Sequence, residues 1–449
     1  MYARTFSRFV RPGLLVATLA AGLAGCGEET STTTNNEPQP EPNPNGQSGF
    51  VASSLEREQN PEVVDGDLET LVKGQNAFAI DLFHQVRGEH DNLFFSPLSI
   101  HQALGMTWAG ARNQTEADMA NTLHFDLDQD RLHPAANLLD LELSSRGDVP
   151  LCDGPDCPQG EAFRLNIVNR LWGQAGFGFL DAFLDTLAVN YGAGLQLMDF
   201  KADPEACREE INGWVEDQTE ERIKDLLPTG SITPSTRLVL TNAIYFKASW
   251  STPFTEGATQ DADFTLDTEE VVKVPTMNAS QGFMSTTTRE YDAVRLPYFG
   301  EEMSMLLVAP AAGLLDDFED NLTAERLASI VGDLQYNSLD LFVPKFTFET
   351  DLPLTKVLKA MGMEIAFSSG ADFSGMDGDG GLAITDVLHK AFVGIDEEGT
   401  EAAAATAVVV GETSAPVFTP MRLDRPFLFF IMDDVTGAVI FMGRMADPR

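Results

Sequence analysis

The chain has 449 residues, of which 43% are hydrophobic, so it is long enough to bury a large core. Asp and Glu number 69 against 29 Lys and Arg, which gives a net charge of −40. So acidic a protein is a poor partner for nucleic acids and other polyanions, and we expect no nucleic-acid ligand.

Residues 1–26, MYARTFSRFVRPGLLVATLAAGLAGC, have the organisation of a secretion signal. Three arginines precede an apolar segment that is too short to cross a bilayer. The segment ends at Leu23-Ala24-Gly25-Cys26, which resembles a bacterial lipobox. We therefore expect Cys26 to carry a lipid. The alternative is an ordinary secretion signal with an incidental cysteine.

Residues 27–66 are rich in Pro, Thr, Asn and Glu, and we expect them to form a disordered tether. We expect a single folded domain over residues 67–449, because no change in composition interrupts this region. The lipobox predicts an extracytoplasmic protein held to the outer membrane or cell surface only by its lipid. Release as a secreted protein is the alternative.

Three cysteines remain after Cys26. Cys152 and Cys157 lie in the loop sequence LCDGPDCP, and outside the cytoplasm a small disulfide loop is the expected pairing. A metal site is the alternative, although no second Cys/His pair with ligand spacing occurs. Cys207 is expected to stay a partly buried thiol.

Apolar periodicity predicts the regular elements. Helices are expected within 71–86, 97–111, 179–191, 211–228, 323–331 and 352–363, with Ser96 as a helix cap. Strands are expected at 92–95, 163–172, 237–250, 263–266, 271–277, 292–299, 304–310, 338–349, 389–399 and, as a hairpin, within 426–445. Both kinds occur throughout, which indicates an α+β protein built on large sheets.

The sequence lacks the common catalytic motifs. It contains no Gly-x-Ser-x-Gly elbow, no HExxH, no phosphate-binding loop and no dinucleotide fingerprint, and its six histidines are scattered. We therefore expect no catalytic residues, no metal and no cofactor. A hydrolase with dispersed catalytic residues stays open as an alternative.

Residues 397–416, EEGTEAAAATAVVVGETSAP, combine conflicting preferences. The alanine-rich stretch favours a helix, whereas the valines that follow favour a strand. The alternatives are an exposed helix that runs into a strand, and a segment whose small side chains serve another purpose.

Several motifs in a fixed order resemble the serpins, the serine protease inhibitor superfamily. They are NLFFSPLS at 92–99, INGWV at 211–215, KDLLP at 224–228, TNAIYFK at 241–247, VPKF at 343–346, ADFSG at 371–375, HKA at 389–391, EEGTEAAAAT at 397–406 and RPFL at 425–428. The resemblance covers residues 67–449 and implies a serpin fold with three β-sheets, about nine helices and an exposed reactive-centre loop at about 399–423.

The resemblance also implies a mechanism. A target serine protease cleaves the loop, and the loop then inserts into the main sheet before the covalent acyl-enzyme hydrolyses. A monomeric protein, acting as an inhibitor rather than an enzyme, is expected. A segment that must enter between paired strands should begin with small residues, and its side chains would alternate between the two faces of the sheet.

The resemblance assigns roles to three groups of residues. The hinge comprises Glu397, Glu398, Gly399, Thr400, Glu401, Ala402, Ala403, Ala404, Ala405 and Thr406. The shutter, where strands separate, comprises Ser96, Ser99, Asn242 and His389. The breach, where insertion begins, comprises Trp250, Lys345 and Glu397.

Counting from Gly399 predicts that the protease cuts between Thr413 and Ser414. Small residues there suit elastase-like or subtilisin-like proteases, whose primary pockets are shallow and apolar. Cleavage after Glu412 or Val410 is the alternative. A non-inhibitory serpin that acts as a binding or structural envelope protein is the second functional hypothesis.

Overall fold

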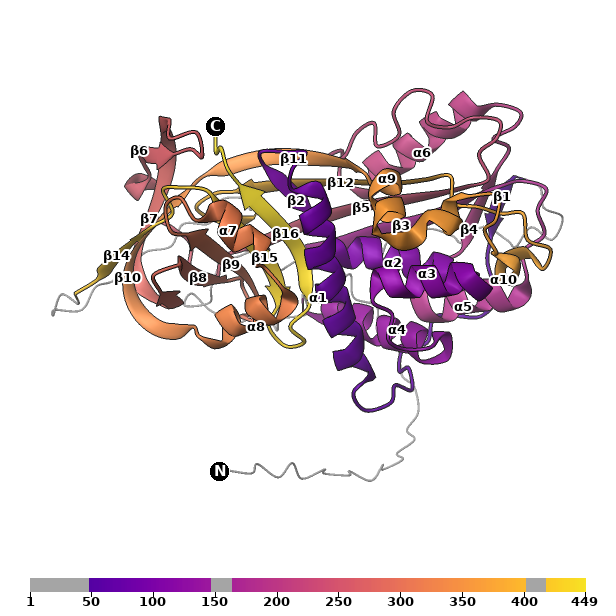
Figure 1. Ribbon diagram of the computed structural model, residues 1–449, viewed down its shortest axis with the longest axis horizontal. Helices are drawn as coiled ribbons and strands as arrows, with labels where there is room; N and C mark the ends of the chain where they lie inside the picture. The colour runs from indigo at the N-terminus through magenta and orange to yellow at the C-terminus, as the bar shows by residue number, and fades with distance from the viewer. Residues whose placement is uncertain (1–47, 147–163, 401–416) are drawn as a thin grey trace, which may run out of the picture. The chain divides into compact units, whose positions relative to one another are not determined.

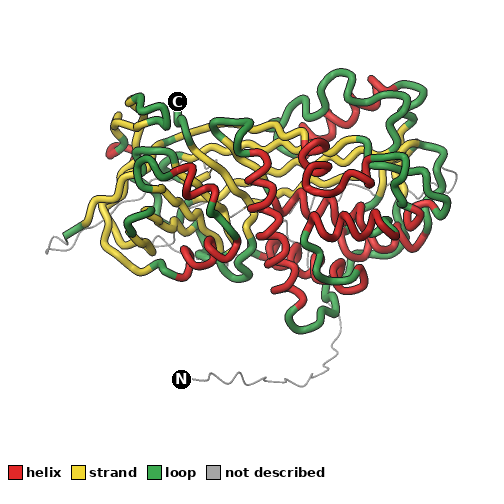
Figure 2. Tube along the Cα trace, in the orientation of Figure 1, coloured by secondary structure: helices red, strands yellow, loops and turns green. Residues whose placement is uncertain are grey.

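The computed structural model describes residues 48–146, 164–400 and 417–449 (Figure 1). Within these residues it contains ten α-helices, which are coloured red in Figure 2 together with short 3₁₀ and π segments. They are α1 Asp67–Val86, α2 Pro97–Trp108, α3 Asn113–Leu123, α4 Gln129–Ser145, α5 Asp181–Tyr191, α6 Pro204–Gln218, α7 Leu315–Asp320, α8 Ala324–Gly332, α9 Leu354–Leu358 and α10 Ser374–Asp377.

The main sheet has seven strands in the order β1-β4-β3-β5-β13-β12-β11. Their bounds are β1 Gly49–Val51, β4 Leu195–Met198, β3 Arg164–Gln174, β5 Leu238–Ser249, β13 Gly399–Thr400, β12 Asp386–Ile395 and β11 Phe346–Pro353. Helix α2 lies on one side of these strands and α6 on the other (Figure 1). Leu240 and Ile244 of β5 join the large core, whereas Val239 and Ala243 pack on the side of α6. The predicted central strand, covered on both faces, is therefore confirmed.

The second sheet has nine strands in the order β14-β10-β7-β8-β9-β15-β16-β2, and β6 also pairs with β7. Their bounds are β14 Thr419–Arg422, β10 Gln335–Pro344, β7 Val271–Thr287, β8 Tyr291–Pro297, β9 Met303–Pro310, β15 Phe427–Asp433, β16 Val439–Met445, β2 Leu93–Phe95 and β6 Gln260–Thr265. Where three sheets were expected, pairing in the described residues forms two. The reason is the long strand β7, whose residues 271–276 pair with β6, residues 276–285 with β10 and residues 284–287 with β8.

The folded body begins earlier than predicted. Strand β1, Gly49–Val51, pairs antiparallel with β4 at the edge of the main sheet. Beyond it, Arg57 donates a hydrogen bond to Asn137 Oδ1 over 2.8 Å and forms an ion pair with Asp140. The prediction of a disordered tether over 27–66 is therefore wrong for residues 49–57. Sheet pairing and the contacts with Asn137 and Asp140 hold these residues in place, although their own sequence is not strongly apolar.

Two predicted elements differ in the structure for local reasons. The helix expected within 211–228 is α6, which begins at Pro204 and ends at Gln218. Beyond it Glu220 and Glu221 have positive φ, and the Asn212 side chain bonds Leu227 N and O, so the chain folds back. The strand expected at 338–349 is two strands, β10 and β11, in different sheets.

Most of the remaining predicted helices and strands lie close to their expected positions, but β7 runs ten residues beyond the predicted 271–277, and the strand predicted at 389–399 is β12, which ends at Ile395 before the separate strand β13. Ser96 caps α2 as predicted, since its hydroxyl oxygen accepts a hydrogen bond from Ser99 N. In the described residues, no helix is both long enough and apolar enough to cross a membrane.

Candidate functional site

Gly399 and Thr400, the first residues of the predicted loop, form the short strand β13 between β5 and β12. Gly399 lies opposite Ser249, and Thr400 lies opposite Ala248 of β5 and Ile395 of β12. A Cβ atom on Gly399 would lie 2.1 Å from the Ala248 carbonyl oxygen. Glycine is therefore needed here, because the two backbones approach so closely.

Beyond β13 the main sheet is closed. Residues 386–391 of β12 pair directly and in parallel with residues 239–244 of β5. The strands thus stand apart at one end, where β13 lies between them, and pair over six positions that begin after a gap of three residues on each strand. A short strand thus lies between β5 and β12 at one end of a sheet in which these two strands are otherwise direct neighbours.

The residues named as the breach lie close together at this end of the sheet. Lys345 Nζ lies 2.5 Å from Glu397 Oε2, and Thr259 Oγ1 donates to Glu397 Oε1 over 2.5 Å. Burial opposes ionisation of Glu397, but the hydrogen bonds from Lys345 and Thr259 outweigh it, so the pKa of Glu397 lies below its usual value. The residue is charged at neutral pH and anchors the segment before β13.

Trp250 holds the same segment from the other side. Its backbone N–H donates to the Glu398 carbonyl oxygen over 2.8 Å, and its indole Nε1 donates to the Asp396 carbonyl oxygen over 3.0 Å. The indole stacks on the ring of Tyr298 with centroids 4.7 Å apart. The Tyr298 hydroxyl in turn lies 2.8 Å from Thr400 Oγ1, and both residues are buried. Thr400 therefore points into the core.

The shutter residues form one buried hydrogen-bond network. Ser99 Oγ donates to Asn242 Oδ1 over 2.9 Å, and His389 Nδ1 contacts the same oxygen. The Ser96 N–H donates to His389 Nε2 over 3.1 Å, and Ser96 Oγ donates to the Ile440 carbonyl oxygen over 2.8 Å. Since Asn242 lies on β5 and His389 opposite it on β12, their contact joins the two strands that meet beyond β13.

This network sets the charge of His389. Burial lowers its pKa to about 3, although the contact with Asn242 acts in the opposite direction. With Nε2 accepting from Ser96, the neutral ring carries its proton on Nδ1 and donates it to Asn242. The imidazole is thus a fixed neutral link across the closed strands.

Two members of the site escaped prediction from the sequence. Asn169 of β3 lies opposite Asn242, accepts a hydrogen bond from it and donates to the Ser99 carbonyl oxygen over 3.1 Å. Tyr298 connects Trp250 with Thr400. Strand β3 also carries Asn166 and Arg170, so nothing in the sequence sets Asn169 apart, and nothing near Tyr298 marks its role.

Other predicted residues lie outside the described ranges. They are Glu401, Ala402, Ala403, Ala404, Ala405, Thr406, Val410, Glu412, Thr413, Ser414, Cys26, Cys152 and Cys157. Cys207 lies within them as a buried thiol, and burial raises its pKa to about 11. Among the described residues no group of three or more His, Cys, Asp or Glu side chains is placed to hold a metal ion.

Comparison with known proteins relates this chain to one family. A family profile described as serpin (serine protease inhibitor) matches residues 73–448. A serpin-like protein of Thermococcus kodakarensis is 37% identical over 401 residues, 88% of this chain and 90% of its own length. The leukocyte elastase inhibitor of Xenopus laevis is 35% identical over 397 residues, covering 85% of this chain and all of its own.

A solved structure agrees with this relationship. The native state of tengpin, a thermophilic serpin, superposes with a TM-score of 0.76 at 26% identity and covers 89% of this chain and 100% of its own. Together the profile match, the relatives and the fold show that the chain belongs to the serpin family.

Proposed function

We propose that this serpin inhibits serine proteases by suicide cleavage of its loop, followed by insertion of the loop between β5 and β12. The observation that carries the proposal is the register of β13. It lies antiparallel to both neighbours, and those neighbours pair in parallel just beyond it. The sheet already holds the first two residues of a strand that the loop could extend.

Extending the register requires no slip of either neighbour. Thr400 lies opposite Ala248 and Ile395, so six residues later Thr406 would fall opposite Asn242 and His389, which already face each other. Strands β5 and β12 would only have to move apart. In the same register, residues 399–410 would match the whole of β5, which has 12 residues.

The two faces of the inserted strand also suit the sheet. Thr400 points into the core, so Ala402, Ala404, Thr406, Val408 and Val410 would follow it on that face. Small side chains come first, where the strands must separate, and valines come last. The Thr406 hydroxyl could accept a hydrogen bond from His389 and donate one to Asn242, replacing the contact that insertion breaks.

Insertion should release free energy that the uncleaved chain retains. Each inserted residue gains ladder hydrogen bonds worth about 1 kcal/mol net, and each buried valine adds about 1.5–3 kcal/mol. The barrier is the closed contact between Asn242 and His389 together with its neighbours. The uncleaved protein is thus a kinetically trapped state.

We propose Thr413–Ser414 as the bond that is cut, and elastase-like or subtilisin-like enzymes as the targets. The length of β5 supports this choice of bond. If residues 399–410 paired along the whole of β5, residues 411–413 would connect the inserted strand to the bound protease. The similarity to a leukocyte elastase inhibitor supports the enzyme class. Cleavage after Glu412 or Val410 would leave a shorter linking arm.

Titration of elastase and subtilisin with the full chain tests the proposal. We expect stoichiometric loss of protease activity and a covalent complex that survives denaturing electrophoresis, with Ser414 as the new N-terminus of the released peptide. A cleaved chain without any complex would instead support the non-inhibitory hypothesis, and turnover of added peptide substrates by the chain would support a hydrolase.

The variant Thr400→Arg tests the role of insertion. Thr400 is 1% exposed, and an arginine there would carry a charge into the core at a cost of several kcal/mol. Insertion should slow, so that the protease hydrolyses the loop as a substrate. We expect at least ten times more inhibitor to be consumed for each protease molecule inactivated.

The matched control is Thr419→Arg, the same change on an exposed position of β14. It should leave the stoichiometry of inhibition close to that of the unchanged chain. If Thr400→Arg inhibited as efficiently as this control, inhibition would not depend on the seating of residue 400 between β5 and β12, where the inserted strand must begin.

We further propose that the protein is held outside the cytoplasm by a lipid on Cys26. The sequence of residues 1–26 supports this proposal. The change Cys26→Ala should move the protein from the membrane fraction to the soluble extracytoplasmic fraction. Detection of labelled fatty acid on the unchanged chain, and its loss in the variant, is the measurement. A soluble unchanged chain without label would contradict the anchor.

A further inference from the structure

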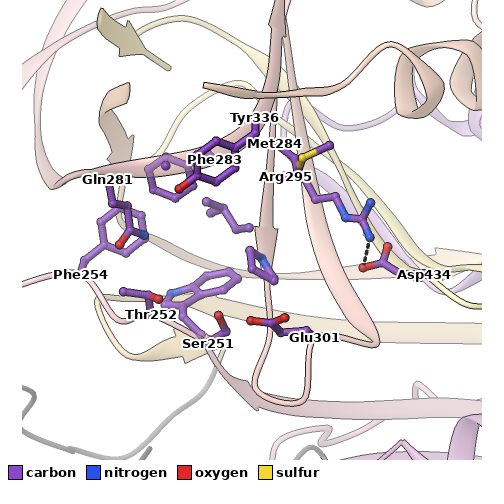
Figure 3. A pocket seen from close by; sticks show the side chains of 14 residues that line it. Ser251, Thr252, Phe254, Gln281, Phe283, Met284, Arg295, Glu301, Tyr336 and Asp434 are labelled. Atoms are coloured by element: carbon purple, nitrogen blue, oxygen red, sulfur yellow. Dashed lines mark ion pairs between the residues drawn. The ribbon is translucent and has the colours of Figure 1, made fainter. Parts of the chain in front are cut away.

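A cavity of about 630 Å³ lies beside the breach, between the end of β5 and strands β7, β8 and β10. In Figure 3 Tyr336, Phe283 and Met284 lie across the cavity from Ser251 and Thr252, with Arg295 and Asp434 at one side. Its volume falls in the range of sites for drug-sized ligands. No role in loop insertion accounts for this space.

Four aromatic side chains line the cavity. Trp250, Phe254 and Phe283 are buried, whereas Tyr336 is 74% exposed. A Cβ atom on Gly282 would lie 1.9 Å from the Tyr336 hydroxyl oxygen, so the phenol lies directly over this glycine. The exposed ring therefore forms a wall of the cavity, offering a flat face to a second ring.

The charge around the cavity is negative. Arg295 forms an ion pair with Asp434 and donates from Nε to Ser304 Oγ over 3.0 Å, so its charge is already compensated. Glu301 lines the cavity and is exposed, and no ion pair of Glu301 occurs among the described residues. A cation over aromatic faces and beside a carboxylate is favoured, and the net charge of −40 adds to this preference.

The segment from Trp250 to Phe254, which lines the cavity, is also hydrogen-bonded to the hinge. The backbone N–H groups of Trp250 and Phe254 donate to the carbonyl oxygens of Glu398 and Glu397 over 2.8 Å and 2.7 Å. Ser251 N–H donates to Pro297, which also lines the cavity. A ligand in contact with this segment would hold the groups that position the start of β13.

We propose that the cavity binds a small amphipathic molecule that carries an aromatic ring system and a positively charged amine, and that its occupancy stiffens the anchor of the hinge. The rings lie against Trp250 and Tyr336, and the amine lies near Glu301. The hinge is thereby coupled to the concentration of such a ligand.

Three probes with one ring system and different charges test the site by calorimetry on the full chain. They are 4-phenylbenzylamine, the neutral 4-biphenylmethanol and the anionic 4-biphenylacetate. We expect the amine to bind at least five times more tightly than the alcohol, and the acid most weakly. Failure of the amine to saturate the chain, or equal affinities for all three probes, would overturn the proposal.

Two variants locate the binding. Glu301→Gln should weaken the amine about fivefold and leave the alcohol unchanged, whereas Tyr336→Ala should weaken both. Glu364→Gln, the same change at an exposed carboxylate on the short helix after α9, is the control and should change neither. Binding of the amine that is unaffected by both cavity variants would place the ligand elsewhere and overturn the assignment.

Hydrogen exchange measures the coupling without any protease, so its outcome is independent of the proposed inhibition. The amine should slow exchange of the Trp250 and Phe254 amides at least threefold in the unchanged chain, and at the same amine concentration the effect should be smaller in Tyr336→Ala. Unchanged exchange at saturating amine would overturn the coupling to the hinge.

Discussion

Three histidines are buried in the folded chain and hold no charge there. Burial lowers the pKa of His101 and of His133 to about 4, and that of His389 to about 3. The neutral rings are bonded instead, as in the contact of His101 Nε2 with the Leu123 carbonyl oxygen over 3.0 Å. Each therefore makes the folded state sensitive to acid.

The change His101→Gln should reduce this sensitivity. Below pH 6.5 the unfolded chain binds a proton at residue 101 that the folded chain refuses, so stability falls as the pH drops from 6.5 towards 4, at about 1.4 kcal/mol per pH unit. Above pH 6.5 this residue has no such effect. Glutamine can still donate to Leu123 but does not titrate. Between pH 7.5 and 5, the unchanged chain should lose about 2 kcal/mol more than the variant.

Urea unfolding at several pH values measures this difference. The control is His90→Gln, in the turn after α1, because it leaves the three buried rings in place. If the free energy of unfolding changed with pH in the same way for the unchanged chain and His101→Gln, His101 would be protonated equally in the folded and unfolded states, contrary to this prediction.

Single residues differ in how far the sequence reveals them. Most of the breach and shutter residues stand in sequence motifs, and in the structure the members of each group contact one another. Asn169 and Tyr298 gain their roles only from partners on other strands, 73 and 102 positions away. No local pattern encodes a contact of that separation.

At the level of elements, the N-terminal strand β1 adds an unexpected edge to the main sheet. Phe50 and Val51 approach Gly194, and Ser53 donates to Asp185. Asn137, which is fully buried, donates to the Glu58 carbonyl oxygen over 2.7 Å and accepts from Arg57. Residues 48–60 thus belong to the folded domain.

A chain that begins at residue 67 should be less stable than one that begins at residue 48. It lacks the β1 ladder and leaves Asn137 without two of its partners, which together should cost about 3 kcal/mol or more. Urea unfolding of both chains gives the difference. Arg57→Ala in the longer chain should show a fraction of this loss, and equal stability of the two truncated chains would mean that β1 contributes nothing.

The elements that were misplaced share one cause. Periodicity locates apolar faces, but it does not tell where a chain reverses. The helix predicted to reach Pro228 ends at Gln218, because Asn212 binds the backbone of Leu227 and draws the chain back. One alternating run becomes β10 and β11 because residues 335–344 pair with β7 in one sheet and residues 346–353 pair with β12 in the other.

For the whole molecule, the proposed mechanism requires an uncleaved state that is not the most stable one. In the structure β5 and β12 pair with each other, and the two residues of β13 lie between them at one end in a register that a longer inserted strand would share. Such a sheet could gain further pairing if the loop entered it. On the proposed mechanism, cleavage of the loop allows residues 401–410 to pair between β5 and β12.

Limited cleavage between residues 411 and 416 should therefore raise the melting temperature. Ten further residues at about 1 kcal/mol each would add about 10 kcal/mol, or roughly 10–20 °C for a domain of this size. Calorimetry of the intact and the cleaved chain is the measurement. Thr400→Arg is the control, since its cleaved form should show a smaller rise. An unchanged melting temperature after complete cleavage would contradict the trapped state.

The sequence by itself determined the α+β class, the central strand β5, the cap of α2 and, through ordered motifs, the serpin family. These features depend on local periodicity, on capping chemistry and on the order of residues, all of which can be read directly from the sequence. Only the tertiary structure decided that β1 belongs to the main sheet, that β7 fuses strands into one large sheet, and that β13 lies in register with the closed strands. Strand pairing joins residues far apart in the chain, and the free energy of each pairing depends on what covers it.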